Sequence, residues 1–289
     1  MRMKLGTLRD GTCDGRLVVI DTDVIHATDV GHVAPSLLRA LEDWDRVAPE
    51  LDRVARGLDG GGQPMERFHE RGAQSPLPHG PRLLVARDPA GPEDATPMLR
   101  PITADGFLDP RGPLPEACEV AVSLAVAAGP VPAGVNQAEA GETIRLALLM
   151  LTLIGPDTEE GMEPICFAPA AVTPDALDHE GEWAVAPRLT INGQAFGPVQ
   201  PIRRDGFAAL IARAAEAGAV EAGSLIAGPT LIRRPVEAGD QIRLEAREPG
   251  GRSIFGAIEQ EIGGALPRPA MAGAGMGIGM AAQMMWAPY

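Results

Sequence analysis

The chain has 289 residues, of which 45% are hydrophobic and 22% charged, a composition that excludes intrinsic disorder and predicts a folded globular protein. With 39 acidic and 25 basic residues it carries a formal charge of −14; such a field repels phosphate backbones, so we expect no nucleic acid partner. The 35 glycines and 28 prolines predict frequent turns, few long helices and a β-rich architecture.

The N-terminal part is predicted to be a small β/α unit. Apolar runs at residues 3–8 and 17–20 are separated by Asp10-Gly11, which indicates a β-hairpin. Over residues 34–58 the apolar side chains recur at three- and four-residue spacings, which predicts a helix that Pro49 should kink or break. The polar start MRMKLGTLRDG has no apolar signal-peptide core, so we expect a cytoplasmic protein.

Further along the chain, strands are expected to dominate. Residues 60–115 are rich in glycine and proline and are predicted to be mostly loop, with one candidate strand at 82–87. The remaining predicted elements are a strand from Glu119, a helix over 137–154, a strand at 188–191 closed by an Asn-Gly turn, a helix over 206–217, a strand near Leu225, and a strand pair at 241–245 and 254–258.

Lysine and cysteine usage limits the available chemistry. Lys4 is the only lysine in the chain, so no lysine further along can serve as an acid, a base or a Schiff-base former. Cys13, Cys118 and Cys166 are odd in number, widely spaced and in no metal-ligand pattern. They are interpreted as thiols in a reducing compartment rather than as a disulfide framework.

Several blocks between residues 3 and 262 occur in an order that resembles the bacterial branch of the fumarylacetoacetate hydrolase family. These blocks are MKLGTLRDGTCDGRLVVI, APSLLRALEDWDRVAPEL, DGFLDPRGPLP, EVAV, FAPAAVTPDAL, LTINGQAFG and GRSIFGAIEQEI. The resemblance implies a β-rich α+β fold, a mixed β-sheet roll. It implies a small N-terminal β/α domain over residues 1–71, a core over 72–264, and a separate tail over 265–289.

The resemblance also implies a chemistry. Members of the family are usually dimeric, and a homodimer through the β-roll is therefore expected. Carboxylates hold a divalent metal, for which oxygen ligands suit Mg²⁺ or Ca²⁺. A histidine-activated water attacks a ketone of a diketo acid, and the metal stabilises the enolate-like leaving group.

Carried over position by position, the metal ligands are mostly absent. The family places two glutamates at alternate positions of the strand that begins EVAV, so that both face one cation. Glu119 fills the second position, Ala117 stands at the first, and Glu116 is one residue out of phase. The next metal ligand, an aspartate, corresponds to Thr152, at the end of the predicted helix 137–154.

The acid–base groups are absent as well. The family's catalytic lysine falls near Met162 or Glu163, and the segment with the water-activating histidine is missing after SPLP, although His79 is nearby. Gly228 and Thr230 retain a trace of the substrate loop. Because a divalent ion is held poorly by one carboxylate, we expect no metal cofactor.

The tail differs in composition from the rest of the chain. Residues 265–289 hold five of the eleven methionines and one charged residue, Arg268. Three roles remain open for it: docking to a partner protein, contact with a membrane, and Cu(I) binding by thioethers. The expected docking residues are Met271, Met276, Met280, Met284, Met285, Trp286 and Tyr289.

Two functions follow from these observations. The favoured hypothesis is a pseudoenzyme, a family scaffold without its metal and acid–base groups that acts as a structural or binding subunit of a larger assembly, which a membrane-contacting tail would place at a membrane. The alternative is a metal-dependent hydrolase or decarboxylase of a small diketo or β-keto acid with a rebuilt site. In that alternative the substitute ligands would be Glu116, Glu119, Asp157 or Glu163.

Overall fold

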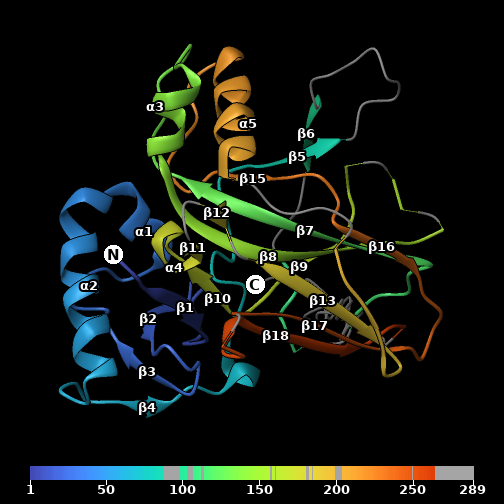
Figure 1. Cartoon of the computed structure of the whole chain (residues 1–289), viewed down its shortest axis with the longest axis horizontal. Helices are drawn as coiled ribbons and strands as arrows, with labels where there is room; N and C mark the ends of the chain where they lie inside the picture. The colour runs from blue at the N-terminus through green and yellow to red at the C-terminus, as the bar shows by residue number, and fades with distance from the viewer. Residues whose placement is uncertain are drawn as a thin grey trace, which may run out of the picture.

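The structure is a computed structural model that describes residues 1–87, 98–102, 107–111, 114–156, 158–159, 161–179, 182–183, 185–198, 204–248 and 250–263. Asp157 and the tail residues predicted to dock a partner lie outside these ranges. The fold is α+β and β-rich, with one large mixed sheet running through the molecule and helices at its periphery (Figure 1). The predicted fold class is confirmed.

The helices are short except for two. They are α1 (Leu37–Glu42), α2 (Trp44–Asp59), α3 (Gln137–Glu142), α4 (Pro174–Leu177) and α5 (Arg204–Glu216), with a 3₁₀ turn, η1, at Glu70–Gly72. Figure 1 shows α1 and α2 beside the N-terminal strands, and α3 paired with α5 at the opposite end of the large sheet. None of the helices in the described ranges has the length and hydropathy that crossing a bilayer requires.

The strands of the large sheet are distributed along the chain between residues 4 and 235. They are β1 (Lys4–Leu8), β2 (Arg16–Ile20), β3 (His26–Asp29), β4 (Glu66–Arg67), β5 (Leu83–Arg87), β6 (Met98–Ile102), β7 (Glu119–Ala128), β8 (Ile144–Ile154), β9 (Ile165–Phe167), β10 (Ala170–Val172), β15 (Leu225–Ala227) and β16 (Ile232–Pro235). Their order is β4-β3-β2-β1-β10-β8-β7-β15-β5-β6, with β16 on β7 and β9 on β8.

Two smaller sheets complete the fold. One is β11 (Asp178–His179) with β12 (Glu182–Trp183). The other has the order β14-β13-β17-β18 and contains β13 (Ala186–Ile191), β14 (Gln194–Phe196), β17 (Gln241–Arg247) and β18 (Ser253–Glu261). The predicted Asn192-Gly193 turn joins β13 to β14 with positive φ at both residues, 48° and 85°, as a tight hairpin requires.

The N-terminal hairpin is part of the large sheet. β1 pairs with β2, as the sequence predicts, and on its other edge with β10. β15 pairs in parallel with β5 and antiparallel with β7, so the sheet is mixed. The predicted domain boundary between residues 71 and 72 remains a prediction. β1 on one side of it and β10 on the other are joined by backbone hydrogen bonds.

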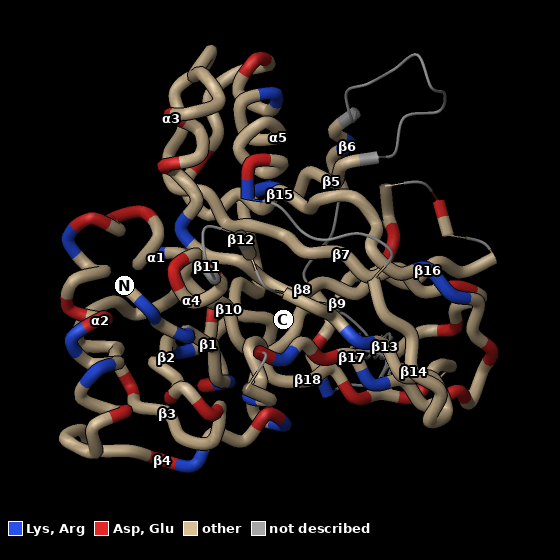
Figure 2. Tube along the Cα trace, in the orientation of Figure 1, with Lys and Arg blue, Asp and Glu red and all other residues tan. Residues whose placement is uncertain are grey.

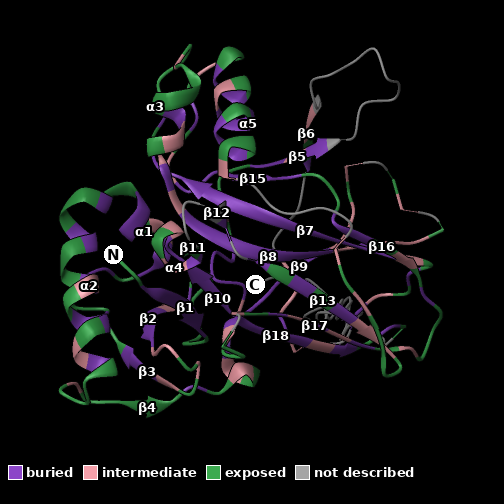
Figure 3. Cartoon of the chain, in the orientation of Figure 1, coloured by how far each residue is buried: buried purple, intermediate pink, exposed green. Residues whose placement is uncertain are grey.

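The core lies on both faces of β7 and β8 (Figure 3). Side chains such as Val122 and Leu124 on β7 pack into one hydrophobic cluster with Leu149 of β8. Ala125 of β7 and Leu148 of β8 pack into a second cluster with the N-terminal strands and helices. The two strands are therefore shielded from water on both sides.

This burial explains why the predicted helix over 137–154 is wrong. Only Gln137–Glu142 is helical, started by a capping box between Asn136 and Glu139, and Ile144–Ile154 is the long strand β8. A strand buried on both faces has no apolar–polar alternation. In a continuous apolar run, helical spacings also occur by chance.

Two further expectations are corrected. The helical segment breaks at Asp43, between α1 and α2, whereas Pro49 lies inside α2 without interrupting it. The stretch 60–115 contains the predicted strand β5, but also β4, η1 and the unpredicted β6. β6 includes Pro101 and ends the sheet order, as expected for a proline strand that needs no hydrogen bonds on its outer edge.

Candidate functional site

A cleft of about 400 Å³ opens on one face of the large sheet, between the β5–β6 pair and the strands β7, β8 and β16. It is lined by Val85, Ala86, Arg100, Ile102, Ala121, Ser123, Met150, Thr152, Ile154, Glu163, Thr230 and Arg233. Most of these are apolar or hydroxyl-bearing, and the charged ones stand on different elements.

Strand register decides which side chains reach the cleft. β7 and β8 are antiparallel, with Ala121 opposite Thr152 and Ser123 opposite Met150. Because alternate residues of a strand share a face, Ala121 and Ser123 on β7 and Thr152 on β8 all line the cleft. Arg233 of β16 lies opposite Ala121 on the other edge of β7 and belongs to the same face.

An ion pair lies at the β7–β16 side of the cleft. Arg233 donates from Nη2 to Oε2 of Glu119 over 2.6 Å. This hydrogen bond from the Arg233 guanidinium lowers the pKa of the Glu119 carboxyl below its ordinary value. The side chain of Glu119 is 29% exposed and that of Arg233 is 57% exposed.

A second, less exposed ion pair lies at the β6 side. Arg100 donates from Nη2 to Oε1 of Glu163 over 2.7 Å, with side-chain exposures of 24% and 12%. The other oxygen of Glu163 accepts the backbone N–H of Gly161 at 3.0 Å. Both carboxylate oxygens of Glu163 are therefore engaged.

The structure places the three positions that the resemblance assigns to the glutamate pair, 116, 117 and 119, at the start of β7. Glu119 begins β7, but Glu116 is exposed and Ala117 buried in the segment before that strand. On the strand itself, the position that shares a face with Glu119 is Ala121. Thr152, which corresponds to the family's next metal ligand, lines the cleft from the strand β8 and not from the end of a helix.

Some of the other predicted site residues line the cleft, and the rest lie outside it. Thr230 and Glu163 line the cleft, whereas Gly228 packs against Phe207 and Met162 is exposed. His79 is outside the cleft lining, with its Nδ1 3.9 Å from Oδ1 of Asp14.

Sequence reasoning missed Arg100, Arg233, Ala121 and Ser123. Period-two alternation starting at Glu119 contained the signal for Ala121 and Ser123. No local signal pointed to Arg100, because the strand that carries it, β6, lies in a stretch predicted to be loop.

The donor set of the cleft does not suit the divalent metal that the resemblance implies. Glu163 in the lining and Glu119 beside the cleft each bind a guanidinium. The neighbours of Glu119 on the same face are Ala121 on β7 and Ile154 on β8, with Thr152 opposite Ala121. In the described part of the chain, no group of three or more His, Cys, Asp and Glu side chains is arranged to hold a metal ion. Mg²⁺ and Ca²⁺ need several oxygen ligands with negative charge.

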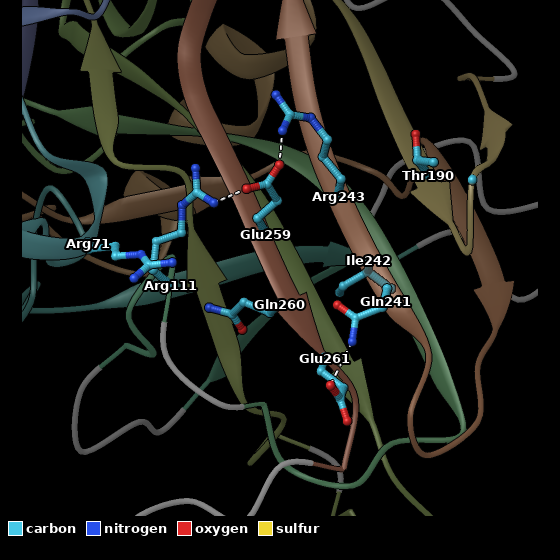
Figure 4. A pocket seen from close by; sticks show the side chains of 10 residues that line it. Arg71, Arg111, Thr190, Gln241, Ile242, Arg243, Glu259, Gln260 and Glu261 are labelled. Atoms are coloured by element: carbon cyan, nitrogen blue, oxygen red, sulfur yellow. Dashed lines mark hydrogen bonds and ion pairs between the residues drawn. The ribbon is translucent and has the colours of Figure 1, made fainter.

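A second hollow, of about 840 Å³, lies on the outer face of the four-stranded sheet (Figure 4). Figure 4 shows Glu259 between Arg111 and Arg243. The alternating charges continue at both ends, in the order Glu70, Arg111, Glu259, Arg243, Glu245 and Arg247. This ion-pair ladder joins η1 to β17 and β18, and we interpret it as structural.

Comparison with known proteins agrees with the geometry of the fold. Residues 3–79 match the family model described as "Fumarylacetoacetase N-terminal domain 2". No curated protein matches the sequence. Solved structures of the same fold cover 90% or more of the chain.

Residues 3–79 are thus similar to an N-terminal domain of fumarylacetoacetase, and the chain has the fold of solved fumarylacetoacetate hydrolase structures.

Three solved structures illustrate the range of the fold. Maleylpyruvate hydrolase from Sphingobium sp. SYK-6, in complex with manganese(II) ion and pyruvate, has a TM-score of 0.66 at 17% identity and covers 91% of this chain and 100% of its own. A probable 2-hydroxyhepta-2,4-diene-1,7-dioate isomerase from Mycobacterium abscessus has a TM-score of 0.65 at 14% identity, covering 92% and 100%. Fumarylacetoacetate hydrolase from Exiguobacterium antarcticum has a TM-score of 0.59 at 15% identity, covering 91% and 100%.

Proposed function

We propose that this chain belongs to the fumarylacetoacetate hydrolase family and is a pseudoenzyme, which binds its ligand without a metal and carries out no metal-dependent hydrolysis. The observation that carries the proposal is the pairing of charges in the cleft. Glu119 with Arg233, and Glu163 with Arg100, form two ion pairs in which each carboxylate already has a cationic partner.

Charge balance supports this reading. A divalent cation entering the cleft would be repelled by both guanidiniums and would have to separate at least one carboxylate from its arginine. Separating Glu163 from Arg100, whose side chain is 24% exposed, would leave a partly buried arginine without that partner, which is unfavourable. Ala121 and Thr152 supply no negative charge to offset this cost.

The alternative function is a metal-dependent hydrolase with a rebuilt ligand set. It is favoured by the fold shared with a maleylpyruvate hydrolase that was solved with manganese(II) and pyruvate. Of its proposed ligands, Glu119 and Glu163 are on opposite sides of the cleft in separate ion pairs, and Glu116 is not in the cleft lining.

Calorimetric titration of the full chain with Mn²⁺, Mg²⁺ and Ca²⁺ separates the two functions. We expect no binding tighter than millimolar, and no turnover of acylpyruvates in the presence of any of the three ions. Micromolar binding that is lost in Glu119→Ala, together with turnover that is lost on chelation, would establish the hydrolase and overturn the pseudoenzyme. Glu116→Ala is the matched control, because Glu116 is exposed and outside the cleft.

The subunit role remains a proposal that rests on composition. We propose that residues 265–289 dock a partner protein, with Trp286 and the methionines as anchors. Purification from the native host, with the full chain and with a chain ending at Gly263, tests it. One protein in fixed stoichiometry with the full chain only is expected, whereas tail-dependent recovery in the membrane fraction without such a protein would favour membrane contact.

A further inference from the structure

We infer that the cleft takes a small neutral molecule with a carbonyl or ester oxygen, in preference to a free carboxylate. This inference rests on the proposed function, because a bound metal would itself attract a carboxylate. It concerns the class of ligand, which the absence of metal chemistry alone does not specify.

The first step of the argument is the state of the cleft's charges. Arg100 is bound by Glu163, and Arg233 by Glu119, so each of these guanidiniums already has a carboxylate partner. A carboxylate ligand must either compete with a resident carboxylate for its guanidinium or lose its hydration without a new cationic partner. Both routes are unfavourable in a partly buried site.

The second step is what the ion pairs leave available. Between them the cleft presents the hydroxyls of Ser123, Thr152 and Thr230 on a lining of aliphatic side chains and Met150. A hydroxyl can donate to a carbonyl or ester oxygen, but it brings no positive charge to offset the desolvation of a carboxylate. Apolar walls with a few polar groups are the usual lining of a small-molecule site.

The third step is size. The volume of about 400 Å³ is near the lower end of the range for small-molecule pockets, about 300–1,000 Å³. Ser123 and Thr152 come from adjacent strands whose register is fixed by the long β7–β8 ladder, so their hydroxyls are held in place before the ligand arrives.

A matched acid and ester test the inference. We would titrate the full chain, in EDTA, with 4-oxopentanoate and with its methyl ester, and follow binding by ligand-observed NMR and calorimetry. The ester is expected to bind at least about tenfold more tightly than the acid. Thr152→Val removes the hydroxyl and keeps the shape of the side chain, and it is expected to lower the affinity for the ester several-fold.

Two variants probe the role of the ion pairs. Glu119→Gln and Glu163→Gln each remove the resident negative charge beside one arginine without shortening the side chain. At least one of the two variants is expected to raise the affinity for the acid about tenfold and to leave the affinity for the ester unchanged. The pair of variants keeps the test valid if one of them does not fold.

The opposite results would overturn the inference. Acid binding to the unaltered protein as tightly as the ester in EDTA, or no binding of the ester, would refute the neutral-ligand assignment and leave the pseudoenzyme standing. Acid binding that appears only when Mn²⁺ replaces EDTA would refute the proposed function together with the inference.

Discussion

Glu119 and Arg233 lie on neighbouring strands, β7 and β16, and their hydrogen bond lowers the pKa of the Glu119 carboxyl from its ordinary value of 4.5. A depressed carboxyl pKa adds stability above the unfolded value, and this contribution disappears as the pH falls through the folded value. The arginine is more than half exposed, so the pair is worth roughly 0.2–1 kcal/mol.

We therefore predict a pH-dependent cost for Glu119→Gln. At pH 7 the substitution should lower the free energy of unfolding by about 0.5 kcal/mol. Below pH 4 the difference from the unaltered protein should shrink, because protonation removes the same charge. Urea unfolding of both proteins at pH 7 and below pH 4 measures it. A difference that grows toward acid would contradict the assignment.

At the scale of elements, the register of β7 against β8 fixes the composition of the cleft. Ala121 faces Thr152 across the ladder, with Glu119 two residues earlier on the same face. The scaffold therefore presents three positions from which carboxylates would converge, and this sequence fills only one of them with an acid.

Ala121→Glu combined with Thr152→Asp should consequently create metal binding. Three carboxylates on one face supply the charge that a divalent ion needs, so we expect Mn²⁺ to bind in the micromolar range, more tightly still when Arg233→Gln is added. Calorimetry measures the affinity, and Thr152→Asp alone is the control, with weak or no binding expected. If the double variant folds but does not bind Mn²⁺, the three positions do not converge closely enough to hold the ion.

β18 contains a glycine that its surroundings require. Gly256 has a φ of 76°, and a Cβ there would lie 2.5 Å from Cγ of Pro169. Gly251 has a similar φ of 87°, with no atom within 4 Å of its Cβ position. The two positions share the backbone strain and differ in the clash.

Comparison of Gly256→Ala with Gly251→Ala isolates that clash. We expect Gly251→Ala to lower the free energy of unfolding by about 1–2 kcal/mol, the cost of a left-handed alanine. Gly256→Ala should lower it by a further ~1–3 kcal/mol, because the neighbouring proline must move. Chemical denaturation gives both values, and equal losses would contradict the packing in the structure.

At the scale of the whole molecule, the N-terminal unit and the core are bound together at several places. β1 pairs with β10, and Lys4 donates from Nζ to the carbonyl of Thr22 at 2.7 Å and to that of Ser253 at 2.5 Å. The ion-pair ladder adds a polar link from η1 to β17 and β18. Basic and acidic residues alternate along β17, whereas the charged residues of β18 are all acidic; both charges are coloured along the chain in Figure 2.

We therefore predict that residues 1–263 unfold in one cooperative transition. One hydrophobic cluster contains Leu5, Trp44 and Phe167, so separating the N-terminal unit would expose the large sheet to water. Scanning calorimetry of a chain ending at Gly263 should give a single peak, with equal calorimetric and van't Hoff enthalpies. Two resolved peaks, with the lower one shifted selectively by Leu5→Ala, would indicate independent domains.

Much of the fold could be predicted from the sequence because its signals are local. The Asn192-Gly193 turn, the N-terminal hairpin and the strand starting at Glu119 depend on residues within a few positions of each other. The helix over 137–154 was predicted wrongly because a strand covered on both faces loses its alternation. Only the packing of the two hydrophobic clusters shows that both faces are covered.

The candidate site was predicted only in part. Thr152, Glu163, Thr230 and Glu119 were singled out by order along the chain, and the first three line the cleft. Ala117 and Glu116 both precede β7, which begins at Glu119, so neither position lies on that strand. The arginines were missed, because a charge that pairs with a residue 63 or 114 positions away leaves no local pattern.

The sequence by itself determined which residue types stand at positions such as 117, 119 and 152, because identity at a position needs no folding. The tertiary structure alone decided how the remaining charges are used. Arg100 and Arg233 reach their carboxylates only after β6 and β16 join the sheet. An ion pair depends on distance in space, which strand register sets and which separation along the chain does not.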